Sequence, residues 1–213
     1  MMFLTSRPAE RSGPLPDPSA VEILVTVGTE LPFDRLVSTV ERWATEQGRA
    51  GSVLAQVGET EHPPTQIAWT RFLDGPEFRQ YFASAKLIVS HAGMGTIIAA
   101  LHDQRPLVVM PRRYRLGEHR NDHQMATATR LAELDRADVA FDEEQLVERL
   151  DDRRVSPKSP IGPYAEESLL RALRLAVLAP GAPISSPSEL AVLRLDPSGS
   201  SRREARSRNR RAE

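Results

Sequence analysis

Residues 90–134 constrain the fold more than any other stretch, because they join the end of a strand to a glycine turn, a helix, another strand and a polar loop. The run before them, residues 87–90, is short and apolar, as expected of a buried parallel strand. His91, Gly93 and Gly95 follow at once. Since glycine lets the backbone approach a ligand closely, the turn is a candidate binding element.

Beyond the turn, Thr96 opens an apolar-periodic segment that continues to Leu101. The free N–H groups and the positive dipole end of this helix therefore face whatever lies over the turn. An anion such as phosphate suits that position. The alternative is a tight strand-to-helix turn that binds nothing, as many doubly wound proteins have.

Strands and helices alternate along the chain. The expected strands span residues 22–28, 52–58, 67–73, 87–90, 107–110 and 138–141. The expected helices span residues 32–48, 76–85, 96–101, 121–134, 142–150 and 164–178. This order predicts an α/β fold with a single Rossmann-like, doubly wound parallel sheet. Ligands of such sheets collect beyond the carboxyl ends of the strands, where Gly28, Leu73, His91 and Pro111 all fall.

The composition fits one domain with two tails. A chain of 213 residues with 40% hydrophobic content supports one solid core. We expect a disordered, Pro-rich leader over residues 1–20, the domain over 21–179 and a disordered tail over 180–213. The chain has no cysteine, which excludes thiolate metal sites, and no apolar run long enough to span a membrane. The formal charge of −1 hides an Arg-rich tail, so the folded part is acidic.

Three motifs carry most of the functional information. They are VTVGTELPFDRL at 25–36, SHAGMGT at 90–96 and MPRRYRLGEHRNDHQ at 110–124. Together they resemble the C-terminal, donor-binding half of the family 28 glycosyltransferases, whose GT-B fold pairs two Rossmann-like domains. The match runs from about Ile23 to Phe141. It is best to single-domain members: bacterial exopolysaccharide glucuronosyltransferase subunits and the catalytic subunit of the split enzyme that adds the second N-acetylglucosamine to dolichol-linked sugar.

The resemblance implies a set of donor-binding residues. The turn that meets the diphosphate corresponds to His91, Gly93, Gly95 and Thr96. Residues near the phosphates on the opposite wall correspond to Gly28 and Thr29, and those that hold the uracil to Phe72 and the backbone of Leu73. The pair that approaches the sugar hydroxyls corresponds to His123 and Gln124.

One position departs from the family pattern. Donor-binding halves commonly place an acidic residue four positions after the second turn glycine, where it takes the ribose hydroxyls. Here that position is Ala99. Either the ribose is held by another group, such as Asp103 or a backbone carbonyl, or donor affinity is weak.

Four arginines precede the sugar-binding pair, at positions 112, 113, 115 and 120. A guanidinium recognises a carboxylate through two parallel hydrogen bonds. We therefore expect a preference for a uronic-acid donor, with Arg115 and Arg120 as the candidate carboxylate ligands. The alternative is that these arginines pair with Glu118, Asp122 or a partner subunit.

The resemblance implies the donor-binding subunit of an inverting glycosyltransferase. It would move a hexose or uronic acid, with glucuronic acid the leading candidate, from a UDP-sugar to a lipid-linked saccharide acceptor. The catalytic base is expected on a separate membrane-anchored subunit with the acceptor half. This chain would then lie in the cytoplasm, peripheral to the inner face of the membrane, docked partly through residues 164–178. A non-catalytic nucleotide-sugar-binding regulatory subunit is the alternative, while an epimerase would need both domains in one chain.

Other site types fit the residues less well. His119 and His123 are spaced to seat zinc on a helix, but the order is not His-Glu-x-x-His and Asn121 suits a helix cap, so we expect no metal. Dinucleotide binding would need spaced glycines after Gly28. The Arg-rich tail lacks the aromatic residues and fold of a nucleic-acid site, so we expect no nucleic acid and no cofactor.

Overall fold

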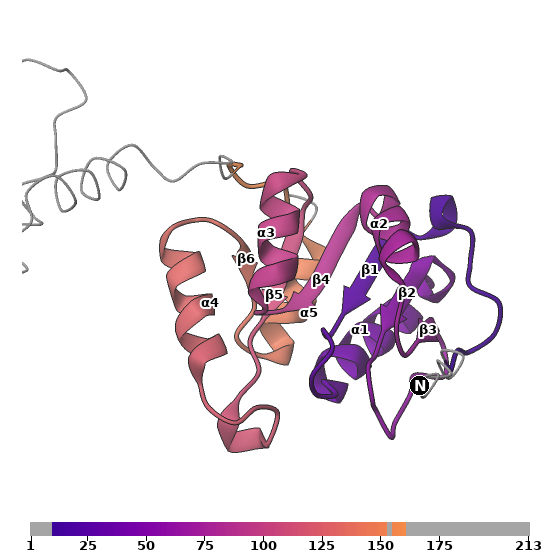
Figure 1. Cartoon of the computed structure of the whole chain (residues 1–213), viewed down its shortest axis with the longest axis horizontal. Helices are drawn as coiled ribbons and strands as arrows, with labels where there is room; N and C mark the ends of the chain where they lie inside the picture. Colours follow the sequence, from indigo (N-terminus) through magenta and orange to yellow (C-terminus); the bar gives the residue numbers. More distant parts are fainter. Residues whose placement is uncertain (1–9, 153–154, 161–213) are drawn as a thin grey trace, which may run out of the picture. The chain divides into compact units, whose positions relative to one another are not determined.

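A computed structural model describes residues 10–152 and 155–160, and Figure 1 shows how they are arranged. One sheet contains β1 (Ile23–Thr26), β2 (Val53–Gln56), β3 (Ala68–Thr70), β4 (Leu87–His91), β5 (Leu107–Met110) and β6 (Asp138–Val139). All neighbouring strands are parallel, in the order β3-β2-β1-β4-β5-β6. The predicted Rossmann-like, doubly wound sheet is therefore confirmed.

The helices lie close to their expected positions. They are α1 (Asp34–Glu46), α2 (Gly75–Ser84), α3 (Met94–His102), α4 (His123–Glu133) and α5 (Glu143–Asp151). Three short 3-10 helices are η1 (Pro18–Ala20), η2 (Ala50–Ser52) and η3 (Tyr114–Leu116). In the described residues no helix has the length and apolar character needed to cross a membrane.

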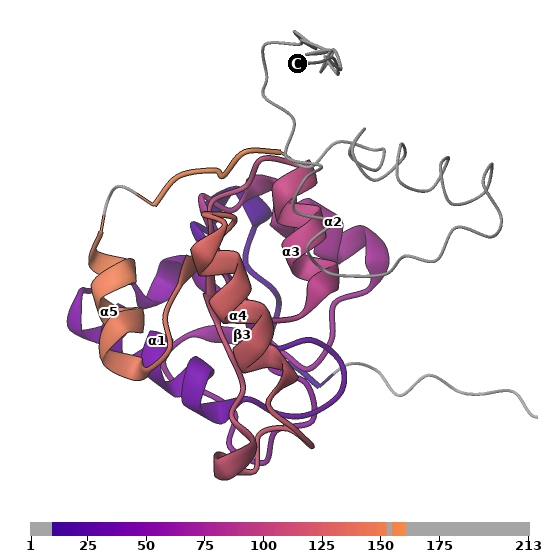
Figure 2. The ribbon, with the colours of Figure 1, turned by 90° about the vertical axis from the view of Figure 1, so that its left-hand side faces the viewer.

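The core has two layers because successive strand residues point to opposite faces of the sheet. In β1, Ile23 and Val25 join the cluster that α1 and α5 cover, whereas Leu24 joins the cluster under α2, α3 and α4. Figure 2 shows α1 and α5 together on one side. Because helices cover both faces of the sheet, the central strands are continuous apolar runs in the sequence.

The outer edge of β3 is covered by residues before η1. Arg11 forms an isolated antiparallel β-bridge with Thr70, and Ser12 donates its backbone N–H to the Trp69 carbonyl at 3.1 Å. The Tyr81 hydroxyl donates to the Pro16 carbonyl at 2.7 Å. These contacts place residues 10–20 against the sheet, where the sequence pattern predicts a disordered leader.

The chain divides into two compact units, Met1–Pro163 and Tyr164–Glu213. The second unit includes the predicted apolar helix at 164–178 and the predicted tail at 180–213, both of which lie outside the described residues. Residues 1–9 of the predicted leader also lie outside them. The fold that positions the site belongs to the first unit alone.

Strands β1 and β4 lie side by side at the centre of the sheet, and the chain leaves them in opposite directions. From β1 it continues to β2 and β3, and from β4 to β5 and β6. The turns after the two strands therefore diverge and open a crevice at the carboxyl edge. Gly28 follows β1, and His91 is the last residue of β4.

Candidate functional site

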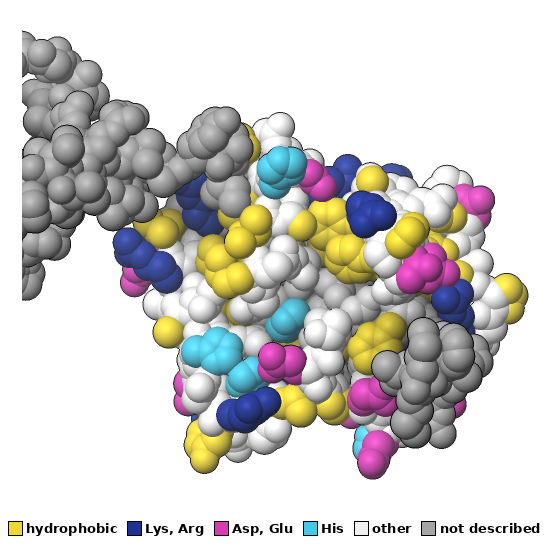
Figure 3. Space-filling model, in the orientation of Figure 1, with side chains coloured by type: hydrophobic (Ala, Val, Ile, Leu, Met, Phe, Trp, Pro, Cys, Tyr) yellow, Lys and Arg dark blue, Asp and Glu magenta, His cyan; other side chains and the backbone are white. Residues whose placement is uncertain are grey.

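A pocket of about 550 Å³ fills the crevice between β1 and β4. Figure 3 shows several histidine side chains gathered on this face, beside α3 and α4. The lining comes from the β1–α1 turn, the β4–α3 turn and the loop that leads into α4. It includes the predicted residues Gly28, Thr29, His91, Gly93, Gly95, Thr96, Arg120, His123 and Gln124.

The N-terminus of α3 opens directly into this pocket. Gly93 is the N-cap and has no side chain with which to cap the helix. Within the described part of the chain, the N–H groups of Met94, Gly95 and Thr96 have no acceptor. Three backbone donors and the positive end of the helix dipole thus converge on the pocket wall. This arrangement suits an anion.

The His91 ring lies between two glycines that leave it room. A Cβ on Gly93 would lie 2.1 Å from His91 Nε2, and a Cβ on Gly28 would lie 2.6 Å from His91 Cε1. Gly28 also has a φ of +80°, which other residues rarely adopt. By contrast, a Cβ on Gly95 would meet nothing within 4 Å. Gly28 and Gly93 therefore seat the histidine, while Gly95 keeps the pocket open.

Burial is the main reason that the pKa of His91 falls from 6.5 to about 4, and the nearby charge of Arg112 lowers it further. The ring is consequently neutral at physiological pH. A neutral imidazole donates one hydrogen bond and accepts another, so His91 can contact a diphosphate without adding a charge of its own.

The four arginines of the loop lie in four different environments. Arg112 is buried and donates to backbone carbonyls, and Arg113 donates to the Phe141 carbonyl. Arg115 is exposed on η3 and does not line the pocket. Arg120 is exposed and does line it. Of the four, Arg112 and Arg120 line the pocket, and of the two candidate carboxylate ligands, Arg115 and Arg120, only Arg120 lines it.

His123 and Gln124 begin α4 and both line the pocket. Gln124 is buried, and its Oε1 accepts the backbone N–H of Arg112 at 3.2 Å. His123 is exposed, and its backbone N–H donates to Asn121 Oδ1 at 3.2 Å. The predicted capping role of Asn121 holds in part, since Asp122 is the N-cap residue while Asn121 accepts the first helical N–H.

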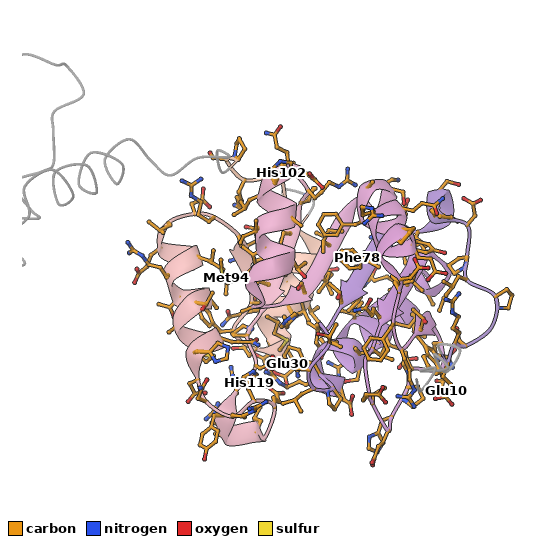
Figure 4. The ribbon with its side chains drawn as sticks, viewed as in Figure 1. Glu10, Glu30, Phe78, Met94, His102 and His119 are labelled. Carbon is orange, nitrogen blue, oxygen red and sulfur yellow. The ribbon has the colours of Figure 1, made fainter. Side chains whose placement is uncertain are left out.

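Glu30 and His119 line the pocket, although the family resemblance assigned neither of them to the donor site. His119 Nε2 lies 3.6 Å from Glu30 Oε2, and Figure 4 shows the two side chains facing each other. His119 Nδ1 accepts the Arg120 backbone N–H at 2.9 Å, so the proton of a neutral ring lies on Nε2, toward Glu30. The position of Glu30 two residues after Gly28 is the signal that marks it.

The two histidines that suggested zinc pack against each other. The rings of His119 and His123 are perpendicular, with centroids 4.4 Å apart. No group of three or more His, Cys, Asp or Glu side chains able to hold a metal ion occurs in residues 10–152 and 155–160. His123 Nδ1 instead contacts Asn121 Oδ1.

The residues expected at the uracil and the ribose are not part of this pocket. Phe72 and Leu73 follow β3 and do not line it, and the Leu73 N–H donates to Gln56 Oε1 at 3.1 Å. Ala99 is half-buried against the core. Asp103 is the C-cap of α3, at the end of the helix away from the pocket, and does not line it.

The family model for the glycosyltransferase family 28 C-terminal domain matches residues 22–174. The chain belongs to this family. It is therefore a glycosyltransferase domain, and the resemblance carried by its three motifs is confirmed. The matched range contains every residue that lines the pocket. No curated protein matches the chain.

Several solved structures are similar to this family member. An NMR structure of ALG13 is 18% identical with a TM-score of 0.46, and the match covers 72% of this chain and 94% of that one. MurG of Acinetobacter baumannii is 19% identical with a TM-score of 0.47, over 64% of this chain and 43% of that one. The glycotransferase of kitacinnamycin is 20% identical with a TM-score of 0.45, over 68% and 38%. This chain thus spans less than half the length of the latter two.

Proposed function

We propose that the pocket binds the diphosphate of a UDP-sugar and that the chain is the donor-binding subunit of an inverting glycosyltransferase. The observation that carries this proposal is the uncapped N-terminus of α3, whose three free N–H groups enter the pocket beside the seated ring of His91. Family membership supports the donor as the ligand. Phe72 and Leu73 remain the proposed uracil contacts, at the side of β1 away from the pocket.

The proposed reaction is a single displacement. The acceptor hydroxyl oxygen attacks the anomeric carbon while the bond from that carbon to the diphosphate oxygen breaks, and UDP leaves with the electron pair. The α3 N–H groups and His91 stabilise the charge that develops on the diphosphate, as preorganised dipoles do in other transferases. The proton of the acceptor hydroxyl passes to a base on the partner subunit.

For the donor sugar, we propose a hexose or uronic acid, with glucuronic acid preferred. Arg120 lines the pocket and is exposed, and it forms no ion pair with any described residue. Its guanidinium is thus available for a sugar carboxylate. Arg115 lies on η3, outside the lining, which makes it the weaker candidate.

The acceptor is proposed to be a lipid-linked saccharide of polysaccharide biosynthesis. The matching family model describes a C-terminal domain, and the acceptor-binding half is proposed to lie on another polypeptide. We propose that this partner is anchored in the membrane and holds the chain at its cytoplasmic face. Residues 164–178, which lie outside the described structure, are the proposed docking segment.

Calorimetry with UDP and ADP tests the binding proposal. We expect UDP to bind and ADP to bind much more weakly, while equal or absent binding of the two removes the uridine assignment. Gly95→Val should abolish UDP binding, since its side chain enters the open pocket. Gly51→Val is the matched control, because a Cβ there also meets nothing within 4 Å and Gly51 lies outside the pocket lining. A Gly95→Val protein that binds UDP normally refutes the site.

A non-catalytic regulatory subunit is the second candidate, favoured by Ala99 at the usual acidic position. Co-expression with the membrane partner separates the two. An enzyme subunit shows no sugar transfer alone and gains it in the complex. If the complex works equally well after His91 and His123 are both changed to Ala, this chain is regulatory.

A further inference from the structure

Arg35 and Arg112 both donate to carbonyl groups of the segment between β5 and α4, and they differ in what neutralises their charge. Arg35 has a side chain that is 12% exposed, and it donates to both oxygens of Glu118, at 2.6 and 2.8 Å. Its Nη1 lies 3.3 Å from Glu143 Oε2. The charge of Arg35 is therefore balanced by carboxylates.

Arg112 is 2% exposed and lines the pocket, but carbonyl groups hold it instead of carboxylates. Its Nη2 donates to the Val27 carbonyl at 2.7 Å and also to that of Leu31. Its Nη1 donates to the carbonyls of Pro32 and Glu118. Among the described residues no carboxylate lies within ion-pair distance of its guanidinium.

A buried cation without a counter-ion is costly, and carbonyl dipoles only orient toward it without cancelling its charge. Burial lowers the pKa of Arg112 to about 10, so the side chain is still charged at neutral pH. A ligand of the opposite charge in the pocket would offset this cost.

The acidic groups that face Arg112 are all partly engaged elsewhere. Glu118 pairs with Arg35, and Asp34 Oδ1 accepts the Thr60 hydroxyl at 2.6 Å. Glu30 is mostly exposed and faces His119. Together they attract the cation from a distance, and each raises its pKa less than burial lowers it. None of the three forms an ion pair with the Arg112 guanidinium, which lines the pocket.

We propose that Arg112 is the buried counter-charge of the diphosphate, a positioning residue that acts on the ligand through its field and through the loops it holds. Its carbonyl partners belong to the β1–α1 turn and to the loop before α4, so one side chain joins two of the three segments that line the pocket. This inference rests on the proposed function, because it takes the diphosphate as the ligand.

The test compares UDP with UMP, which carries less negative charge, in NMR titrations of the full chain. Arg112→Gln keeps an amide that can reach carbonyl groups but removes the charge. We expect it to weaken UDP binding about tenfold or more and UMP binding clearly less, because the lost attraction grows with ligand charge. Equal losses for the two ligands would overturn the inference and leave Arg112 as a structural residue.

Two further variants sharpen the result. Arg71→Gln is the matched control, because Arg71 also donates to two loop carbonyls, those of Gly58 and Thr60, and lies outside the pocket lining. It should leave the UDP-to-UMP preference unchanged. If Arg112→Gln does not fold, Arg112→Lys decides: it keeps the charge, so we expect the UDP-to-UMP preference to stay within about threefold of that of the wild type. A folded Arg112→Lys protein that loses this preference overturns the inference.

Failure of the proposed function gives a different result. If the wild-type chain binds UDP no more tightly than UMP, the pocket is not a diphosphate site, whatever the variants do. If the wild type prefers UDP and Arg112→Gln keeps that preference, the diphosphate site stands and only the role of Arg112 falls.

Discussion

The pocket has two walls that bind through different parts of the polypeptide. The glycine wall, residues 28 and 91–96, presents backbone N–H groups, whose positions are fixed by the backbone of the turn and of α3. The loop wall, residues 111–124, presents long side chains. In the glycine wall, glycines are required because a Cβ would collide with His91 or enter the pocket. In the loop wall, arginines that are close in sequence have different contacts.

The contrast shows which kind of binding site can be predicted from a sequence. Gly28 and Gly93 are needed because nothing larger fits beside His91. Nothing local distinguishes Arg112 from Arg115, yet one is buried under the pocket and the other is exposed beside it. A backbone site depends on local spacing, while a side-chain site depends on partners that the fold brings from elsewhere.

The largest expected effect tests the glycine wall. Gly28→Val combines a disfavoured φ of +80° with a Cβ 2.6 Å from His91, costs of about 1–2 and 1–3 kcal/mol respectively. We expect the free energy of unfolding to fall by about 2–5 kcal/mol in urea titrations. Gly48→Val is the control, because Gly48 has a φ of +65° and open space around its Cβ. If both variants lose the same stability, His91 is not held by Gly28.

The next effect concerns the charge state of His91. The unfolded chain binds a proton there near pH 6.5 and the folded chain only near pH 4, so acidification favours unfolding. The stabilisation is complete above pH 6.5 and is lost as the pH falls to about 4. The shift corresponds to about 3 kcal/mol.

Urea titrations of wild type and His91→Gln across this pH window measure that contribution. The wild type should lose about 3 kcal/mol more than the variant between pH 7 and pH 4. His102→Gln is the control, since the His102 side chain is 70% exposed and should add no comparable difference. Parallel curves for wild type and His91→Gln would show that His91 is not desolvated.

Much of the fold and part of the site could be predicted from the sequence. Apolar runs such as residues 107–110 are buried on both faces, so their strands were predictable. The glycine turn predicted a helix starting at Thr96, two residues after the observed start at Met94. The pairing of His119 with Glu30 could not be predicted, because it joins side chains 89 positions apart in the sequence. The edge contacts of Arg11 and Ser12 were missed because a Pro-rich segment has no periodicity to reveal them.

A smaller effect tests the loop wall. Arg120→Ala should weaken the binding of UDP-glucuronic acid by about 1.5–3 kcal/mol, the scale of a hydrogen bond between charged groups. It should weaken the binding of UDP-glucose by much less. Arg115→Ala, outside the lining, should change both donors little. Competition assays with the two donors give the answer. If UDP-glucose binds as tightly as UDP-glucuronic acid, or if Arg120→Ala weakens the binding of both donors equally, no arginine binds a sugar carboxylate.

The central claim is that the α3 N-terminus holds the donor diphosphate, and the amide resonances of Met94, Gly95 and Thr96 report on it directly. In a UDP titration followed by amide NMR, we expect all three to shift and saturate together, as free N–H groups gain an acceptor. The Gly48 and Gly51 amides, outside the pocket lining, should stay in place. UDP that binds without moving the three α3 amides, or no binding at all, would contradict the account.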